Sequence, residues 1–218
     1  MNNLLLNLIS LTLSNCPNIQ PMTEFNTSEY IRSTWFIQEQ QITGYQPENA
    51  LYCVAQTLNL TNRTVPFFNG NVISVFNYGN LNQVNGRSEN AGNFTLCARQ
   101  TNTTDPARII NAPCFLPNFL AGPYWVLAAG PRTDNYTWAI VSGGPPNIKY
   151  PDGNCSTSLS GTNGSGLWLF SRHRFGELAD YTVRIMRDLL VNMGITLSQL
   201  MNVEQQGCNY TGAYIKNF

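Results

Sequence analysis

Short stretches in which apolar and polar residues alternate recur along most of the chain, separated by clusters of Gly, Asn, Pro and Thr. Alternation with a period of two is typical of strands with one buried face, and such clusters are typical of turns. The pattern predicts eight strands, at Thr34–Gln41, Leu51–Asn59, Asn71–Gly79, Gln83–Asn90, Ala107–Phe115, Tyr124–Gly130, Tyr136–Ser142 and Leu167–Arg172. Eight short strands in sequence indicate an all-β sandwich or barrel.

One segment near the C-terminus, Glu177–Met193, has the periodicity of a helix instead. Six apolar residues gather on one of its faces at i, i+3 and i+4 spacing, namely Leu178, Ile185, Met186, Leu189, Leu190 and Met193. Gly194 follows directly, as is typical of the residue after a helix C-terminus. We therefore expect one amphipathic helix that packs on the strands.

Two stretches interrupt the series of strands and are predicted to be insertions. Ala91–Asp105 contains Cys97 and is expected to form a loop or a short extra hairpin. Pro145–Gly166 is rich in Gly, Ser, Asn and Pro, contains Cys155, and is expected to form a long loop.

The composition excludes several classes of partner. Hydrophobic residues make up 43% of the 218 residues, which is enough for a packed core, and the length suits one domain. Charged residues make up only 11%, with 12 Lys and Arg against 12 Asp and Glu. A chain without excess positive charge has no electrostatic field to attract nucleic acid or an anionic membrane surface.

Several features indicate export. Met1–Asn15 has an apolar stretch of the length of a signal-peptide core, so we expect a signal peptide at 1–15 and a mature domain at 16–218, with no membrane-spanning segment in it. The six cysteines are an even number, which in an exported chain predicts disulfides. They lack C-x-x-C spacing, and His173 is the single histidine, so neither a metal site nor a cofactor is expected.

Nine sites match the N-x-S/T pattern for N-glycosylation. The expected acceptors are Asn26, Asn59, Asn62, Asn93, Asn102, Asn135, Asn163 and Asn209. Asn154, the ninth, is the weakest because Cys155 occupies its middle position. An Asn-rich chain produces such sites by chance, so only some of them are expected to carry glycans.

Four motifs, in this order, resemble the lipocalin family. The first is Cys16-Pro17 with Phe25, Tyr30 and Ser33-Thr34-Trp35-Phe36, where Ser33 stands in place of the family's Gly. The others are Val84-Asn85-Gly86-Arg87 with Asp105-Pro106-Ala107-Arg108-Ile109; Tyr124-Trp125-Val126-Leu127-Ala128 with Tyr136-Thr137-Trp138-Ala139-Ile140-Val141; and Leu167-Trp168-Leu169-Phe170-Ser171-Arg172. The resemblance extends from Cys16 to Cys208.

The resemblance implies an eight-stranded antiparallel up-and-down β-barrel, the lipocalin calyx, with one C-terminal α-helix packed on its outside. It also implies that Arg172 packs over Trp35 and closes one end of the barrel. Such a cation–π contact contributes roughly 0.5–2 kcal/mol. The alternative is that Trp35 is an ordinary core residue and Arg172 an ordinary surface residue.

The family resemblance also suggests a disulfide pairing. The tail of the family is commonly tied to the second strand, which corresponds to Cys208 with Cys53. Cys16 is similar to a cysteine that pairs just after the seventh strand, where Cys155 lies. Cys97 and Cys114 then remain. The alternative pairing of these four cysteines, Cys16–Cys114 together with Cys97–Cys155, remains open.

An outward Cys53 orients the interior of the expected barrel. Since successive side chains of a strand point to opposite faces, Tyr52, Val54 and Gln56 then point inward. On the first strand, Ile37 and Glu39 are expected to point to the same face as Trp35. On the last strand, Trp168 and Phe170 are expected to point to the same face as Arg172. The predicted ligand-lining residues are Ile37, Tyr52, Val54, Gln56, Trp168 and Phe170. Alternatively, these side chains fill the barrel.

The expected function is therefore that of a secreted carrier for a small hydrophobic ligand, of the fatty acid, sterol, retinoid, carotenoid or bilin class. An enzyme of lipocalin fold, acting on a lipid or pigment, is one alternative. It would need a free nucleophilic Cys or a partner for His173 or Glu39, and the sequence indicates none. A secreted interaction protein with a filled barrel is the other alternative, suggested by Pro145–Gly166.

Overall fold

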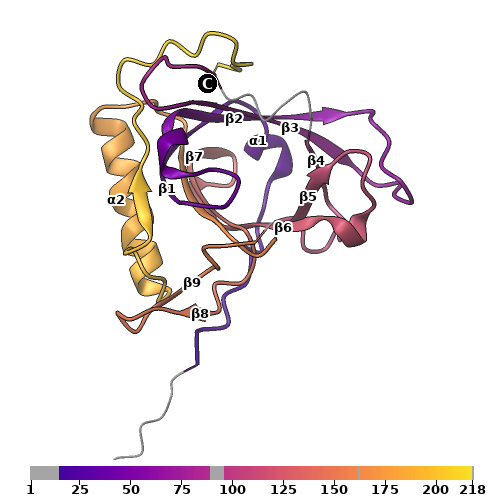
Figure 1. Cartoon of the computed structure of the whole chain (residues 1–218). Helices are drawn as coiled ribbons and strands as arrows, with labels where there is room; N and C mark the ends of the chain where they lie inside the picture. Colours follow the sequence, from indigo (N-terminus) through magenta and orange to yellow (C-terminus); the bar gives the residue numbers. More distant parts are fainter. Residues whose placement is uncertain (1–14, 89–95, 162, 218) are drawn as a thin grey trace, which may run out of the picture.

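Eight antiparallel strands close into one barrel in the computed structural model, which describes residues 15–88, 96–161 and 163–217 (Figure 1). The barrel strands are β1 Trp35–Gln41, β2 Tyr52–Thr61, β3 Val72–Asn80, β4 Leu96–Arg99, β5 Arg108–Pro113, β6 Gly122–Arg132, β7 Asn135–Ser142 and β10 Leu167–Ser171. Each strand pairs with the next, and β10 pairs with β1 to close the ring. The prediction of an all-β, up-and-down barrel is confirmed.

The remaining elements lie outside the ring of eight strands. They are α1 Thr27–Tyr30, η1 Glu48–Ala50, η2 Asn118–Leu120, β8 Ile148–Lys149, β9 Cys155–Ser156, α2 Glu177–Asn192 and β11 Leu200–Asn202. None of the helices in the described part of the chain is long and apolar enough to cross a membrane. Almost the whole expected signal peptide (residues 1–14) and the glycosylation site Asn93 lie outside the described residues.

The fourth barrel strand was predicted at the wrong place. We expected it at Gln83–Asn90, but residues 81–87 form turns and bends, and β4 is Leu96–Arg99, inside the expected insertion Ala91–Asp105. Asn82 and Asn85 have positive φ angles of 66° and 57°, far from the extended backbone of a regular strand. β4 instead offers Leu96 and Ala98 to the core. The second lipocalin-like motif therefore begins in the turns between β3 and β4.

Because the strands alternate in direction, their connections gather at two ends of the barrel. The start of β1 and the end of β10 define one of these, which we call the Trp35 end. The connections after β1, β3, β5 and β7 lie at the opposite end, which we call the far end. The positions of the strands around the barrel decide which side chains can meet inside it.

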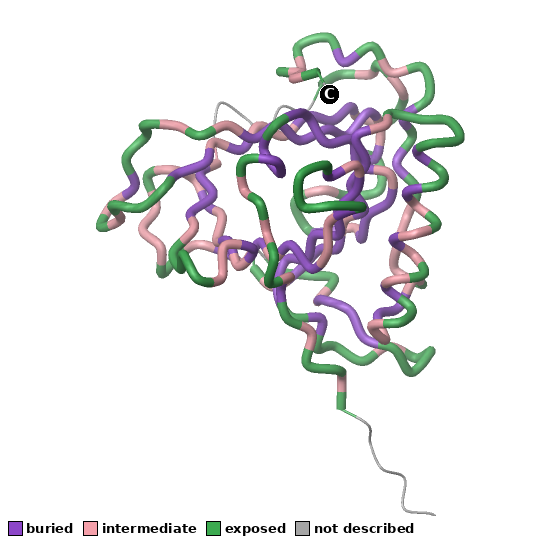
Figure 2. Tube along the Cα trace, turned by 180° about the vertical axis from the view of Figure 1, so that it is seen from behind, coloured by how far each residue is buried: buried purple, intermediate pink, exposed green. Residues whose placement is uncertain are grey.

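The main core is the interior of the barrel, and the strands that surround it are mostly buried (Figure 2). Many of its side chains are apolar and fully enclosed: Leu58, Ile73, Ile109, Val126 and Val141 are all at most 1% exposed. A barrel of eight strands encloses a space that side chains largely fill, with room for at most one small ligand.

Helix α2 packs on the outer face of the barrel, beside β7 and β10 (Figure 1). Met186 and Leu190 lie fully buried against Ile140 and Leu169, which point out of the barrel. Gly194, just beyond the helix, has a φ of 71°, the left-handed conformation that ends helices. The prediction of one amphipathic C-terminal helix is confirmed.

All six cysteines form disulfides. They are Cys16–Cys155, Cys53–Cys208 and Cys97–Cys114, with Cα–Cα distances of 5.8, 5.6 and 4.9 Å. This is the pairing that the family resemblance implied, and the exchanged alternative is not the one found. Pro145–Gly166 is not only a loop, because β8 and β9 pair within it and Cys155 ties it to the N-terminal lead.

Candidate functional site

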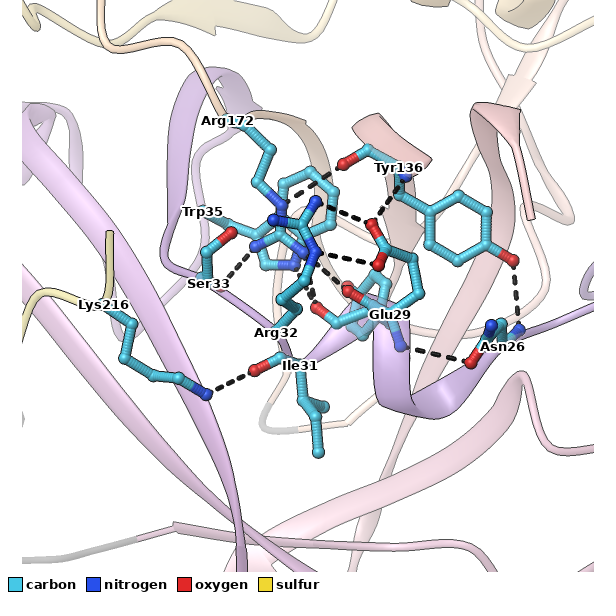
Figure 3. A network of polar contacts seen from close by, with 10 residues as sticks. Asn26, Glu29, Ile31, Arg32, Ser33, Trp35, Tyr136, Arg172 and Lys216 are labelled. Carbon is cyan, nitrogen blue, oxygen red and sulfur yellow. Dashed lines mark hydrogen bonds and ion pairs between the residues drawn. The ribbon is translucent and has the colours of Figure 1, made fainter. Parts of the chain in front are cut away.

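Arg172 closes the Trp35 end of the barrel. Its guanidinium carbon lies 3.3 Å from the centre of the Trp35 ring, and only 3% of the residue is exposed. The same guanidinium donates hydrogen bonds to the backbone carbonyls of Glu29 at 3.1 Å, Tyr30 at 2.9 Å and Ser33 (Figure 3). The structure thus brings Arg172 and Trp35 together as the resemblance implied, and does not place Arg172 at the surface.

Burial lowers the pKa of Arg172 to about 9, with the nearby Tyr30 acting in the opposite direction. The side chain therefore remains charged at neutral pH. Trp35 donates its Nε1–H to the carbonyl of Tyr30 at 2.9 Å, so Tyr30 accepts from both members of the pair. The charged, hydrogen-bonded Arg172 and Trp35 together form a plug that separates the interior from solvent at this end.

A second layer of contacts holds the plug in place, through helix α1. The Glu29 carboxylate accepts hydrogen bonds from the Arg32 guanidinium at 2.8 Å and from the Tyr136 backbone N–H at 2.9 Å. Desolvation raises the pKa of Glu29, but these hydrogen bonds and the charges of Arg32 and Arg172 outweigh it, so the pKa lies below its usual value. Lys216, in the C-terminal tail, donates to the Ile31 carbonyl at 2.6 Å (Figure 3).

Asn26, one of the expected glycosylation acceptors, takes part in this layer. Its side-chain oxygen accepts the Glu29 N–H at 3.1 Å and so caps helix α1, while its backbone N–H donates to the Tyr136 hydroxyl at 3.0 Å. Asn26 is nevertheless exposed, as are Asn62, Asn102, Asn135, Asn154, Asn163 and Asn209, whereas Asn59 is half-buried. Exposure is what glycosylation requires, and occupancy of these sites stays a prediction.

Five of the six predicted lining residues face the barrel interior. Ile37, Val54 and Phe170 are buried in its core, and Trp168 is half-buried against it. Gln56 belongs to the same interior through its hydrogen bond with Tyr124.

Tyr52 is the exception. It is half-buried and is not a member of the described interior cluster. The pairing of β2 with β3 jumps from Tyr52↔Asn80 to Ala55↔Tyr78, and Cys53 has a φ of 54°. A bulge with one extra residue interrupts the alternation on which the inward prediction for Tyr52 depended.

Sequence reasoning missed a chain of polar groups inside the barrel. The Tyr30 and Tyr124 hydroxyls lie 2.7 Å apart, and Tyr124 donates to the Gln56 side-chain oxygen at 2.7 Å. Gln56 in turn donates to Asn77 at 2.9 Å. Burial raises the pKa of Tyr124 well above its usual value, so both hydroxyls are neutral. The alternation of β6 was the available signal for Tyr124, which points inward like Val126.

The prediction that Glu39 points inward is wrong. The pairing of β1 with β10 jumps from Ile37↔Phe170 to Glu39↔Leu169, so a bulge at Gln38 reverses the alternation. Glu39 lies on the outside, where both its oxygens accept hydrogen bonds from Arg187 of α2 at 2.8 Å. Its neighbour Gln40 takes the inward position.

The groups that the enzyme alternative would need are the cysteines, Glu39 and His173. All six cysteines are in disulfides, so no thiolate nucleophile is present. Glu39 is bound to Arg187 on the outside of the barrel. His173 is half-buried, and desolvation lowers its pKa, while its carbonyl accepts a hydrogen bond from Gln38.

A surface hollow of about 510 Å³ lies at the turn between β6 and β7. It is lined by Met22, Glu24, Ala129, Pro131, Arg132, Thr133 and Asp134. None of the six predicted lining residues contributes to it, so this hollow is separate from the predicted site in the barrel.

Inward-facing side chains differ in exposure between the two ends of the barrel. At the Trp35 end, Trp35 and Phe170 are at most 2% exposed, and Gln56, which pairs with Trp35, is 8% exposed. Towards the far end, four inward-facing side chains are half-buried, namely Asn77, Leu96, Asn111 and Trp168. These four side chains are therefore partly accessible to solvent.

Comparisons with known proteins agree with this architecture. No protein-family model matches the chain. Over 201 residues it is 24% identical to apolipoprotein D of Mus musculus, covering 90% of this chain and 85% of that protein. Lobster apocrustacyanin A1 is 17% identical, with a TM-score of 0.54 over 91% of this chain and 95% of its own.

Insecticyanin from the tobacco hornworm Manduca sexta is 15% identical, with a TM-score of 0.53 over 88% of this chain and 87% of its own. All three of these proteins are lipocalins. The chain therefore has the lipocalin fold, and its resemblance to that family is confirmed.

Proposed function

We propose that this protein carries one small hydrophobic molecule inside its barrel, as a secreted carrier rather than an enzyme. The observation that carries the proposal is the difference between the two ends of the barrel. The Trp35 end is closed by the buried Arg172, whereas solvent reaches inward-facing Trp168 and Leu96 at the far end. A barrel interior that is closed at one end and lined mostly by apolar side chains suits a ligand held by burial.

Burial of apolar surface is non-directional, so it does not select among the ligand classes expected from the sequence. We therefore propose a fatty acid, sterol, retinoid, carotenoid or bilin as the bound molecule. Each methylene group taken out of water contributes about 0.8 kcal/mol. The interior also contains the polar side chains of Gln56 and Tyr124, but these are already hydrogen-bonded to each other. The bound molecule is therefore held chiefly by its apolar body.

The direct test is the protein purified from its native source. We would record its absorbance spectrum and then identify the molecules in an organic extract by mass spectrometry. One hydrophobic compound in stoichiometric amount, coloured or not, would support the proposal and identify the cargo.

A second test uses the recombinant protein and N-phenyl-1-naphthylamine, an uncharged fluorophore that brightens in apolar sites. Val54→Phe adds volume to the interior next to Gly79 and should abolish binding of the fluorophore. Val191→Phe, the matched control on the exposed face of α2, should leave binding unchanged. If the wild-type protein binds no fluorophore, the barrel is filled, and an interaction protein becomes the better hypothesis.

Secretion and glycosylation belong to the same proposal. Three disulfides are typical of an oxidising compartment, and most of the possible acceptor asparagines are exposed. We expect the mature chain to begin near Cys16 and to lose mass on treatment with an N-glycosidase. N-terminal sequencing and mass spectrometry of the native protein test both points.

A further inference from the structure

Gln40 is the one glutamine of β1 whose side chain enters the barrel. It lies opposite Trp168 on β10 and opposite Met201 on β11, and both of these residues pack against the interior core. Its neighbour Glu39 is bound to Arg187 outside the barrel. Because successive side chains of a strand alternate, Gln40 points inward.

The Gln40 amide is fully buried and has no partner. The residue is 0% exposed, and neither its Nε2 nor its Oε1 has a hydrogen-bond partner among the residues that the structure describes. Other buried glutamines are satisfied: Gln56 binds Tyr124 and Asn77 through its two ends, and Gln205 donates to two backbone carbonyls. Buried polar groups are nearly always paired, so an unpaired amide at this place requires an explanation.

We propose that Gln40 is the polar anchor of the bound molecule, an inference that rests on the proposed carrier function. A primary amide offers both donors and an acceptor. Its complement is a group that itself accepts and donates a hydrogen bond, such as a hydroxyl or a carboxamide. The apolar body of the molecule then lies against the apolar wall of the barrel.

The polar group of the molecule is neutral. The inward-facing positions of the described strands carry no lysine and no carboxylate. Two arginines of the described chain are buried: Arg172 is bound to backbone carbonyls at the Trp35 end, and Arg99, next to the inward-facing Ala98, points outward and donates to the carbonyls of Pro113 and Leu116. An unpaired carboxylate beside Gln40 would be buried without a counter-charge, which is strongly unfavourable. The geometry therefore favours alcohols and amides over fatty acid anions.

Trp168 controls the approach to Gln40. Gln40 has no exposed surface, but Trp168, directly opposite on β10, is half-buried and within reach of solvent at the far end. A molecule that binds Gln40 displaces this indole. Its binding therefore changes the tryptophan fluorescence, and the change is absent in Trp168→Phe.

The test compares four twelve-carbon probes by their ability to displace N-phenyl-1-naphthylamine: dodecan-1-ol, dodecanamide, dodecanoate and 1-chlorododecane. The alcohol and the amide should bind the wild-type protein about ten-fold more tightly than the chloride does. Gln40→Met, which keeps the length of the side chain, should reduce this preference to less than two-fold. The affinity of this variant for 1-chlorododecane should equal that of the wild-type protein. Without any probe, its thermal midpoint should be no lower than that of the wild-type protein, because an unpaired amide is removed.

Gln38→Met is the matched control. Gln38 lies on the same strand, but its Nε2 already donates to the carbonyls of His173 and Arg174. This variant should keep the full preference for the alcohol and the amide and should lose thermal stability instead. The two variants thus separate loss of an anchor from loss of a structural hydrogen bond.

Three results would overturn the inference. Equal binding of alcohol, amide and chloride to the wild-type protein would show that no polar anchor exists, with the carrier function intact. Tighter binding of dodecanoate than of dodecan-1-ol would refute the neutral class. Failure of every probe, including the fluorophore, would refute the carrier function itself and this inference with it.

Discussion

Replacing Arg172 by Met tests the closed end of the barrel most directly. The change removes the guanidinium that lies over Trp35 and keeps the length of the side chain. Two of the carbonyls that it serves retain other donors, since Tyr30 still accepts from the Trp35 indole and Glu29 from the Arg32 backbone N–H. Among the described contacts, the Ser33 carbonyl loses its donor and stays buried, and the Tyr136 carbonyl loses the longer hydrogen bond from Arg172 Nε at 3.4 Å.

The loss can be estimated from these contacts. An orphaned buried carbonyl costs about 1–3 kcal/mol. The desolvated cation–π contact contributes about 2 kcal/mol more. We therefore expect Arg172→Met to lower the free energy of unfolding by about 3–5 kcal/mol, which lies in the range measured for broken buried charged contacts. For a domain of this size that is a fall in Tm of about 6–20 °C.

The assay is urea unfolding at pH 7 with the disulfides intact, followed by tryptophan fluorescence and circular dichroism. The matched control is Arg108→Met, because Arg108 also lies over a tryptophan, at 4.3 Å from the Trp125 ring, and is paired with Asp105. Its side chain is 34% exposed, so we expect a loss below about 1 kcal/mol. Equal losses in the two variants would refute the idea that burial makes the Arg172 contact important.

Three further outcomes follow from the disulfides and the carboxylates. Removing Cys53–Cys208, which spans 155 residues, should lower the free energy of unfolding by about 5 kcal/mol. Removing Cys97–Cys114, which spans 17 residues, should lower it by about 3 kcal/mol. Similar urea midpoints for the two double Cys→Ser variants would contradict this order. The Glu29 carboxylate has a lowered pKa in the folded state, so its contribution is complete above about pH 4.5 and is lost as the pH falls through the folded value. Glu29→Gln should therefore flatten the decline of the urea midpoint between pH 6 and pH 3, and an unchanged slope would show that another group causes it. Glu39→Gln breaks an ion pair whose arginine is 41% exposed, so it should cost less than about 1 kcal/mol and leave fluorophore binding intact; lost binding would place Glu39 inside the barrel after all.

The sequence by itself determined most of the framework. Alternation of apolar and polar residues predicted seven of the eight barrel strands at nearly their observed places, because each of these strands buries one face. The period of 3.6 residues likewise predicted α2, whose Met186 and Leu190 are buried on the barrel. These signals are local, so a linear sequence contains them completely.

The tertiary structure alone decided which residues meet inside the barrel. One extra residue at Gln38 turns Glu39 outward and Gln40 inward, and another near Cys53 separates Tyr52 from the interior. Such bulges arise where strand pairing shifts, and pairing depends on a partner strand far away in the sequence. The contact of Tyr124 with Tyr30, 94 residues apart, has the same origin. The candidate site is thus set by cross-strand register, which no local pattern of residues encodes.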